Sequence, residues 1–342
     1  CFRDVLGNNL KFPEEIVGTY HSSCIVDNGR LGSNNNLIVT IMGKNASGRH
    51  ISEVGNYGDK REHYASKYVL EHAPPNDPEA CIRSLEEFDV RWTMLHLGQE
   101  KGKHLDRAVR ALILEKRRQE KECNHEKTNR PIRALEIGSY IGYSAIRIGR
   151  ILAAEADAGS TLLSVEQNED NAGYAKVHVD HAGLKETVMV LHSKIEECFD
   201  DNNNNNEDDN YNGNVDIDID ETINNIGGGE DTIRCCRPYD FVFLDHRKPF
   251  YLRDLELLES RGVIDTNVTT VVADNVGPLE HLQFRARAIA DGRRKRPCKC
   301  VNKACNFLDY VRRNWSCTEV LYGENTKDGI SVSRPAYEPQ IE

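Results

Sequence analysis

The segment ALEIGSYIGYS, residues 134–144, is typical of a short β-strand that runs through a glycine turn into a helix. Gly138 and Gly142 lack a Cβ, so the backbone can approach a ligand at the carboxyl end of the strand, where open α/β sheets bind ligands. The glycines are four residues apart and do not form the G-x-G-x-x-G of dinucleotide enzymes. Glu136 lies just before the first glycine. A carboxylate there favours a cationic ligand over a pyrophosphate.

Short apolar runs alternate with helical stretches on both sides of this segment. The alternation predicts a doubly wound, Rossmann-like α/β fold with helices on both faces of the sheet. We expect seven strands, at residues 133–137, 161–165, 187–191, 241–244, 269–273, 318–322 and 329–334. The last two are closely joined and should form an antiparallel hairpin at a sheet edge. Apolar spacing predicts helices at residues 61–70, 79–97, 104–118 and 306–313, and Asn76-Asp77-Pro78 is a start signal for the second.

Composition divides the chain into one domain, an extension and two inserts. Residues 1–59 are rich in Gly, Asn and Ser without periodicity, which predicts a poorly ordered extension before a domain at 60–342. A low-complexity acidic insert at about 200–232 and a basic, cysteine-containing insert at about 281–304 interrupt the domain. Asp200 to Asp231 alone contains eleven acidic and no basic residues, which equals the net charge of −11. The charge of the chain therefore says little about its partners.

The overall composition favours a globular protein in a reducing compartment. The 342 residues are 39% hydrophobic, enough for a core, and the eleven cysteines are scattered and odd in number, unlike a disulfide scaffold. No apolar run approaches the roughly 20 residues that a membrane helix needs. We expect a cytoplasmic monomer with no membrane segment in this chain. The sequence begins at Cys1 rather than Met, so the expectation leaves open a preceding segment.

Polar side chains follow two neighbouring strands where each strand ends. Asp245 comes directly after FVFL, and Asp274 with Asn275 comes directly after VVA. Carboxyl ends of parallel strands meet at one sheet edge, and hard oxygen ligands without Cys or His suit Mg²⁺. Either acid alone is better explained as a helix cap, but their joint occurrence favours a metal site. Lys248 follows Asp245 by three residues and is either a surface lysine or a general base whose charged form the cation disfavours.

A carboxylate also ends the second strand. Glu166 follows LSV at the place where such folds hold the two ribose hydroxyls of an adenosine moiety. The alternative is a solvated glutamate with no ligand.

These separated motifs together resemble catechol O-methyltransferase. The matching segments are residues 136–144, 162–168, HAGL at 181–184, FLDH at 243–246 with Lys248 and Tyr251, and ADNV at 273–276. The resemblance spans roughly residues 61–334 apart from the inserts. It implies a methyltransferase sheet that binds S-adenosylmethionine and Mg²⁺ and methylates one hydroxyl of a small-molecule catechol.

The resemblance also implies roles for individual residues. Asp245, Asp274 and Asn275 would hold Mg²⁺, and Lys248 would take the catechol proton. The residues expected to contact the substrate are Lys248, Asn275, Pro278 and Glu324. Those expected to line the cofactor are Glu136, Gly138, Tyr140, Tyr143, Ser144, Glu166, Gln167, Glu196, Asp245 and His246. Among the latter, Glu196 is the expected acceptor for the adenine amino group, because the chain lacks the family's Ser-Gln pair after the third strand.

Two departures from the family pattern leave the identity of the substrate undecided. Arg247 stands where the family has an aromatic wall, and RWTMLHLG at 91–98 is one residue longer than its counterpart, so either Trp92 or a residue nearer Leu95 takes the wall position. A methyltransferase for a phenylpropanoid thioester or a hydroxylated RNA base, and a catalytically silent S-adenosylmethionine-binding protein, stay as alternatives. We expect no nucleic-acid partner, because the basic insert lacks interleaved aromatics. Its three thiols, Cys298, Cys300 and Cys305, are one ligand short of a closed zinc site.

Overall fold

A computed structural model of the chain describes residues 57–122, 130–198, 237–276, 299–323 and 328–336. All of them belong to the second of two compact units, Met42–Glu342. The first unit, Cys1–Ile41, lies outside the described residues, as do the acidic insert, residues 281–298 of the basic insert, Pro278 and Glu324. The side chains of Cys300 and Cys305 are also outside the described set. The predicted roles of these segments therefore stay predictions.

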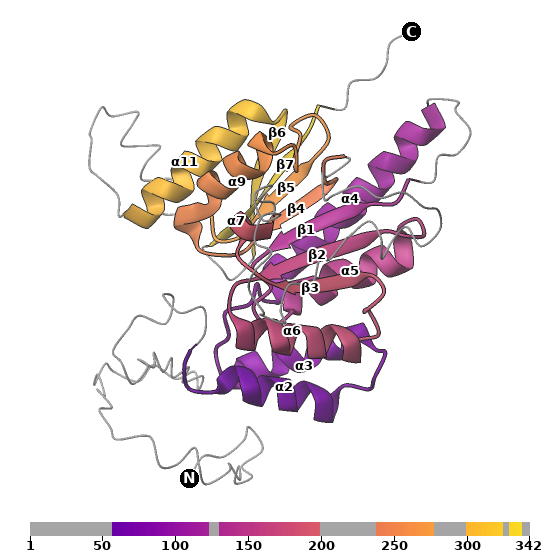
Figure 1. Cartoon of the computed structure of the whole chain (residues 1–342), viewed down its shortest axis with the longest axis vertical. Coiled ribbons are helices and arrows are strands. Elements are labelled where there is room, and N and C mark those ends of the chain that lie inside the picture. The colour runs from indigo at the N-terminus through magenta and orange to yellow at the C-terminus, as the bar shows by residue number, and fades with distance from the viewer. Residues whose placement is uncertain (1–56, 123–129, 199–236, 277–298, 324–327, 337–342) are drawn as a thin grey trace, which may run out of the picture. The chain divides into compact units, whose positions relative to one another are not determined.

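The described residues form a seven-stranded sheet with helices on both faces (Figure 1). Its strands follow the order β3-β2-β1-β4-β5-β7-β6. Strands β1 to β5 pair in parallel, and β7 pairs antiparallel with both β5 and β6. The predicted doubly wound sheet with an edge hairpin is confirmed. The strand bounds are β1 Arg133–Ile137, β2 Thr161–Glu166, β3 Val188–His192, β4 Phe241–Leu244, β5 Thr270–Ala273, β6 Cys317–Tyr322 and β7 Gly329–Arg334.

The helices divide between the two faces of the sheet. Their bounds are α2 Arg61–His72, α3 Pro78–Arg91, α4 Gln99–Glu122, α5 Tyr143–Glu155, α6 Glu169–His181, α7 Ile195–Cys198, α9 Tyr251–Ser260 and α11 Lys299–Asn314, with a short 3-10 helix η3 at Lys248–Phe250. Helices α2 to α6 share one hydrophobic cluster, and α9 and α11 share the other. In the described part of the chain, none of the helices combines the length and the apolar character needed to cross a membrane.

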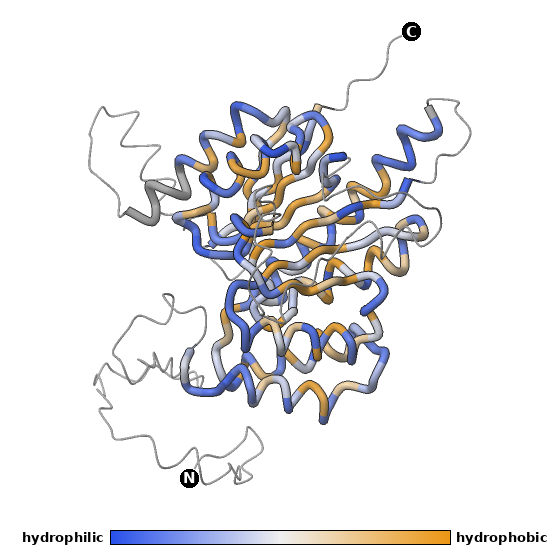
Figure 2. The backbone as a smooth tube through the Cα atoms, viewed as in Figure 1, coloured by the Kyte–Doolittle hydropathy of each residue, from blue (hydrophilic) through white to orange (hydrophobic). Residues whose placement is uncertain are grey.

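Side chains that alternate in direction along each strand belong in turn to the two hydrophobic clusters. In β4, Phe241 and Phe243 belong to the first cluster, whereas Val242 and Leu244 belong to the second. All four are buried, because successive strand side chains point to opposite faces and both faces are covered. The apolar strands at the centre of Figure 2 show the same arrangement, with hydrophilic residues along the outer helices.

Helix α3 begins as predicted but ends earlier. The Asp77 carboxylate accepts a hydrogen bond from the Ala80 amide (2.8 Å), and Pro78 occupies the first turn. The expected continuation to residue 97 is wrong. The helix ends at Arg91, and the Asp89 carboxylate accepts from the Met94 amide (2.5 Å), which holds the chain in a non-helical turn. Helix α4 then begins at Gln99, five residues earlier than expected.

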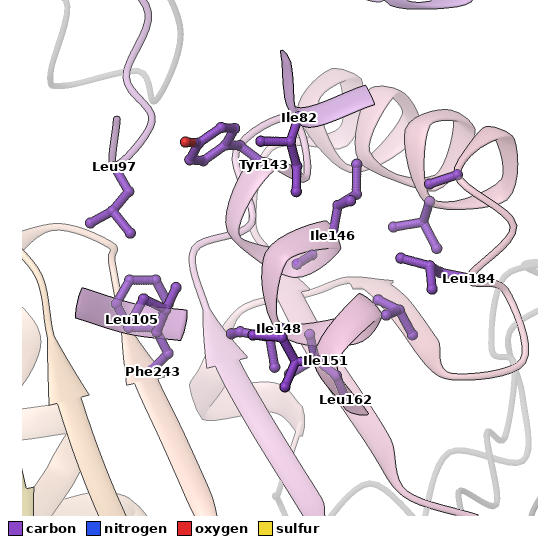
Figure 3. Packing of buried hydrophobic residues seen from close by; sticks show 14 of the residues in the cluster. Ile82, Leu97, Leu105, Tyr143, Ile146, Ile148, Ile151, Leu162, Leu184 and Phe243 are labelled. Atoms are coloured by element: carbon purple, nitrogen blue, oxygen red, sulfur yellow. The ribbon is translucent and has the colours of Figure 1, made fainter. Parts of the chain in front are cut away.

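Helix α5, which follows the glycine turn, is the most completely enclosed helix among those described. Ile146, Ile148 and Ile151 point into the first cluster (Figure 3). Phe243 of β4 and Leu105 of α4 belong to the same cluster and are both 0% exposed (Figure 3). The strand that leads to Asp245 therefore contributes to the cluster that α4 and α5 share.

We predict that Phe243→Ala lowers the free energy of unfolding by about 3–5 kcal/mol, because the change leaves a cavity under α4. Urea unfolding followed by circular dichroism measures the effect. The control is Leu114→Ala on α4, where the side chain is 65% exposed and the expected change is within about 0.5 kcal/mol. Equal effects of the two substitutions would contradict the assigned burial.

Candidate functional site

The candidate site lies where four parallel strands end. Backbone hydrogen bonds continue one residue past these ends, from Gly138 to the Val165 carbonyl (2.8 Å) and from Asp245 to the Ile137 carbonyl (2.9 Å). The Asp274 amide donates to Leu244 in the same way (2.9 Å). The glycine turn and the two acids are therefore placed by the register of the sheet.

The glycine turn lies directly against the loop that carries Asp245. Gly138 has φ +100°, and a Cβ on it would lie 2.7 Å from the Asp245 backbone oxygen. A side chain of any kind is therefore excluded at this position. Tyr140 follows with φ +49°, an uncommon conformation for a large residue. Its amide donates to Glu166 Oε2 (2.9 Å), and its hydroxyl donates to the buried Glu62 of α2 (2.7 Å).

Glu166 is a buried carboxylate held by backbone amides. Besides the Tyr140 amide on Oε2, Oε1 accepts from the Asn168 amide (2.8 Å). Burial raises the pKa of Glu166, although these amides oppose the rise. Each carboxylate oxygen can accept a second hydrogen bond, so the residue retains capacity for ligand hydroxyls. Gln167, the next predicted cofactor contact, is exposed.

Glu136 lies fully buried below the turn. Burial raises its pKa to about 7, and the hydroxyls of Ser144 and Ser164 act against that rise. The Ser164 hydroxyl donates to the Glu136 carboxyl and also contacts the hydroxyl of Ser139. The arrangement supplies a carboxyl group that a nearby positive charge would ionise.

Two other residues that were predicted to contact the cofactor form hydrogen bonds or ion pairs with side chains of the protein. The Tyr143 hydroxyl donates to Glu86 (2.6 Å) and accepts from Arg147 (2.9 Å), which ties α5 to α3. Glu196 forms an ion pair with Arg253 (2.7 Å). An adenine amino group would therefore share the Glu196 carboxylate with a guanidinium.

His246 is positioned from beneath by helix α9. Its Nε2 lies 2.7 Å from Oδ2 of the buried Asp254, and its ring packs at a tilt on Tyr251 (4.9 Å between centroids). The Tyr251 hydroxyl donates to the Asp274 carbonyl (3.0 Å). Helix α9 thus connects the two loops that carry the acids.

The predicted metal ligands lie at the ends of β4 and β5. Asp274 is buried and Asp245 is half-buried. Asn275 has φ +52°, a left-handed conformation that Asn tolerates better than most residues. Its Nδ2 donates to Asp328 Oδ2 (2.5 Å), which directs its amide oxygen away from that contact.

Lys101 of α4 enters this acidic centre and was not predicted. Its Nζ lies 2.7 Å from both oxygens of Asp274 and 3.7 Å from Asp328 Oδ2. Asp328 lies just before β7 and was missed as well. A local signal existed for the lysine, because Lys101 is four residues before Leu105 on α4 and so lies on the same buried face of the helix.

The residues fit a divalent cation in their charge. Among the described residues, no three His, Cys, Asp or Glu side chains are grouped so that they could hold a metal ion, and the predicted ligand set has two carboxylates and one amide. Burial and the charge of Asp274 raise the pKa of Asp245 well above its usual range. Burial also raises the pKa of Asp274, although Lys101 opposes the rise. A cation of charge +2 would stabilise both ionised acids, with water and substrate completing its shell.

The predicted base lies beside the first of these acids. Lys248 is half-buried at the start of η3, and its positive charge acts against the raised pKa of Asp245. The neighbouring Arg247 is exposed, with its guanidinium carbon 5.5 Å from the centre of the Phe250 ring. The place of the family's aromatic wall is therefore taken by a solvent-facing cation.

Comparison with known proteins relates the sequence of the chain to one family. No known family model matches the chain. The chain is 33% identical over 239 residues to a Mycobacterium tuberculosis protein named "Probable O-methyltransferase Rv1703c", over 70% of this chain and 82% of that one. It is 31% identical to catechol O-methyltransferase of Sus scrofa over 53% of this chain and 71% of that protein. The chain belongs to the O-methyltransferase family that includes catechol O-methyltransferase.

Two further comparisons show the extent of the likeness. Catechol O-methyltransferase of Bos taurus is 28% identical over 64% of this chain, and the match covers 62% of that protein's length. Among solved structures, an O-methyltransferase from Bacillus cereus in complex with SAH matches with a TM-score of 0.45 and 16% identity, over 84% of this chain and 96% of that one.

We predict that Glu136 makes stability fall with pH. Its pKa rises from 4.5 to about 7 on folding, so the folded protein binds this proton more tightly than the unfolded chain does. The stability that the protonated Glu136 contributes is therefore fully present below pH 4.5, its pKa in the unfolded chain, and is lost as the pH rises towards 7. Glu136→Gln removes the loss and should raise the free energy of unfolding at pH 8 by up to about 3 kcal/mol.

Urea unfolding at pH 5 and pH 8 measures this difference. The expected gain for Glu136→Gln shrinks at pH 5, whereas Glu186→Gln, whose side chain is 88% exposed, should have little effect at either pH. A gain that is independent of pH would contradict the assigned titration.

Proposed function

We propose that the protein transfers a methyl group from S-adenosylmethionine to one hydroxyl of a catechol that is bound to Mg²⁺ through both oxygens. The observation that carries the proposal is the contact between the glycine turn and the Asp245 loop. It joins the region expected to hold the cofactor to the acids expected to hold the metal. The relatives named catechol O-methyltransferase support the same substrate class.

Asp245, Asp274 and Asn275 are the residues that would hold Mg²⁺. When bound there, Mg²⁺ would supply Lewis-acid stabilisation of the substrate oxygens and help to orient them. The register of β4 and β5 sets the spacing of the two acids, and Asp328 orients the Asn275 amide. These contacts reduce the reorganisation that binding requires.

Lys248 is our candidate for the base that takes the hydroxyl proton. It lies beside Asp245, and no hydrogen bond or ion pair from the described residues engages its amine. His246, the other nearby base, has its Nε2 on Asp254, and its Nδ1 is buried without a hydrogen-bond partner. We therefore favour Lys248, whose side chain is only partly buried, over the enclosed Nδ1 lone pair of His246.

The glycine turn and the second strand end would bind the cofactor. Glu166 would accept the ribose hydroxyls, and the buried Glu136 would favour the positive charge that S-adenosylmethionine carries. Gly138, Tyr140 and Ser144 would surround the methionine end. A sulfonium methyl held here would face the oxygens at the ends of β4 and β5.

We predict that the purified protein methylates simple catechols with labelled S-adenosylmethionine and Mg²⁺, and that EDTA stops turnover. The acids need a divalent cation to offset their charge, so adding excess Mg²⁺ back should restore the rate. Phenylpropanoid thioesters and hydroxylated RNA bases form the comparison panel, because Arg247 leaves the ring wall open. Turnover that persists in EDTA would remove the metal from the proposal, and faster turnover of a thioester or RNA would replace the substrate.

We predict that Lys248→Ala lowers kcat by roughly 10² to 10⁴, the loss expected for a general base, while S-adenosylmethionine binding is retained. Steady-state kinetics and calorimetric titration of the cofactor measure the two effects. Lys185→Ala is the control, because that side chain is 70% exposed on the surface. An unchanged kcat in the Lys248 variant would assign the base to another group.

A further inference from the structure

The acidic centre contains an amino group that the proposed reaction does not use. Lys101 approaches both carboxylate oxygens of Asp274 at 2.7 Å, although the two residues are 173 positions apart in the chain. The lysine is 9% exposed and Asp274 is 2% exposed. An ammonium group therefore lies on a carboxylate that is expected to bind Mg²⁺.

The charges of the centre do not balance with this lysine alone. Asp245, Asp274 and Asp328 come from three different strand ends, and all three interact electrostatically with Lys101. If all three are ionised, they face the positive charges of Lys101 and of Lys248, which also acts on Asp245. The acids outnumber the lysines, so the centre keeps a net negative charge that a cation would offset.

Lys101 keeps its charge in this position. Its Nζ lies 2.7 Å from the Asp274 carboxylate and 3.7 Å from Asp328 Oδ2. A buried ammonium of this kind is stable only beside carboxylates.

The backbone holds the lysine in the centre. Lys101 lies in the first turn of α4, and a Cβ added to the next residue, Gly102, would lie 2.7 Å from the Arg147 guanidinium of α5. The helices are thus in close contact at this point. Leu105, one helical turn after Lys101, points into the hydrophobic cluster (Figure 3). The start of α4 is therefore held by packing on both sides of Lys101.

We propose that Lys101 is a resident counter-cation, which stabilises the acidic centre when no divalent cation is bound and competes with the divalent cation for Asp274. The inference rests on the Mg²⁺ site of the proposed function. It assigns to the lysine the control of metal affinity, with Asp328 as the opposing charge. Lys101 is a positioning residue here and takes no part in methyl transfer.

The test uses Lys101→Met, which keeps the length of the side chain and removes its charge. Mn²⁺ binding is measured from the decrease in the electron paramagnetic resonance signal of free Mn²⁺. Thermal unfolding is measured in EDTA. We expect Lys101→Met to bind Mn²⁺ at least about tenfold more tightly, because the competing charge is gone. We also expect a lower Tm in EDTA, because Asp274 is then buried without a partner. Lys103→Met is the matched control, since Lys103 is exposed on the same helix.

A second variant changes the centre in the opposite direction. Asp328→Asn removes a negative charge near Lys101, and we expect it to weaken Mn²⁺ binding and leave Lys101 on Asp274. A general loosening of the fold would weaken binding in both variants, so opposite signs distinguish control of affinity from structural damage. If Lys101→Met does not fold, Lys101→Gln takes its place, because it offers Asp274 a neutral donor.

The outcomes separate the two proposals. If the wild-type protein binds Mn²⁺ as tightly as the Lys101 variant, or more tightly, Lys101 is not a counter-cation, but the metal site stands. An unchanged Tm in EDTA would overturn the stabilising role. If neither protein binds Mn²⁺, the metal site fails and the role of Lys101 fails with it.

Discussion

The contact between Gly138 and the backbone of Asp245 is the constraint on which the candidate site depends. Adjacent strands β1 and β4 end side by side, and only a residue without a Cβ lets their two loops touch. One loop then carries the expected cofactor contacts and the other the expected metal ligands. The distance between them is set by strand register, which is more rigid than a loop.

Placing so many acids at one sheet edge lowers the stability of the protein. Glu136, Glu166, Asp245 and Asp274 all have pKa values raised chiefly by burial, so each would be more stable as a neutral group or beside a cation. Carboxylates shifted in this way are typical of functional sites. The strained φ values of Tyr140 and Asn275 fall in the same region. The sheet core, buried on both faces, holds these groups together.

The sequence predicts the strands well because short runs rich in apolar residues, as in β4 and β5, are expected for strands covered on both faces. Strands β1, β4 and β7 have the predicted bounds, and the acids after β4 and β5 could be found because they directly follow such runs. Helix α3 was predicted too long, since Trp92 and Met94 continue its apolar spacing while the Asp89 side chain ends the helix. Lys101 and Asp328 were missed because their contacts join segments far apart in the chain. The spacing of Lys101 from Leu105 indicates that the lysine is buried, but not which acids it contacts.

The helices that precede the sheet belong to the site as well as to the core. Tyr140 links Glu166 to Glu62 of α2, and Lys101 brings α4 onto Asp274. Both contacts are buried, so a substitution that breaks either of them would disturb the glycine turn, the acids and the helices together. Arg247 differs, because its side chain is exposed and lies over the Phe250 ring. A substitution at Arg247 is therefore expected to disturb the fold less than one at the acids or the glycine turn, which would leave it free to vary if the proposed substrate site includes it.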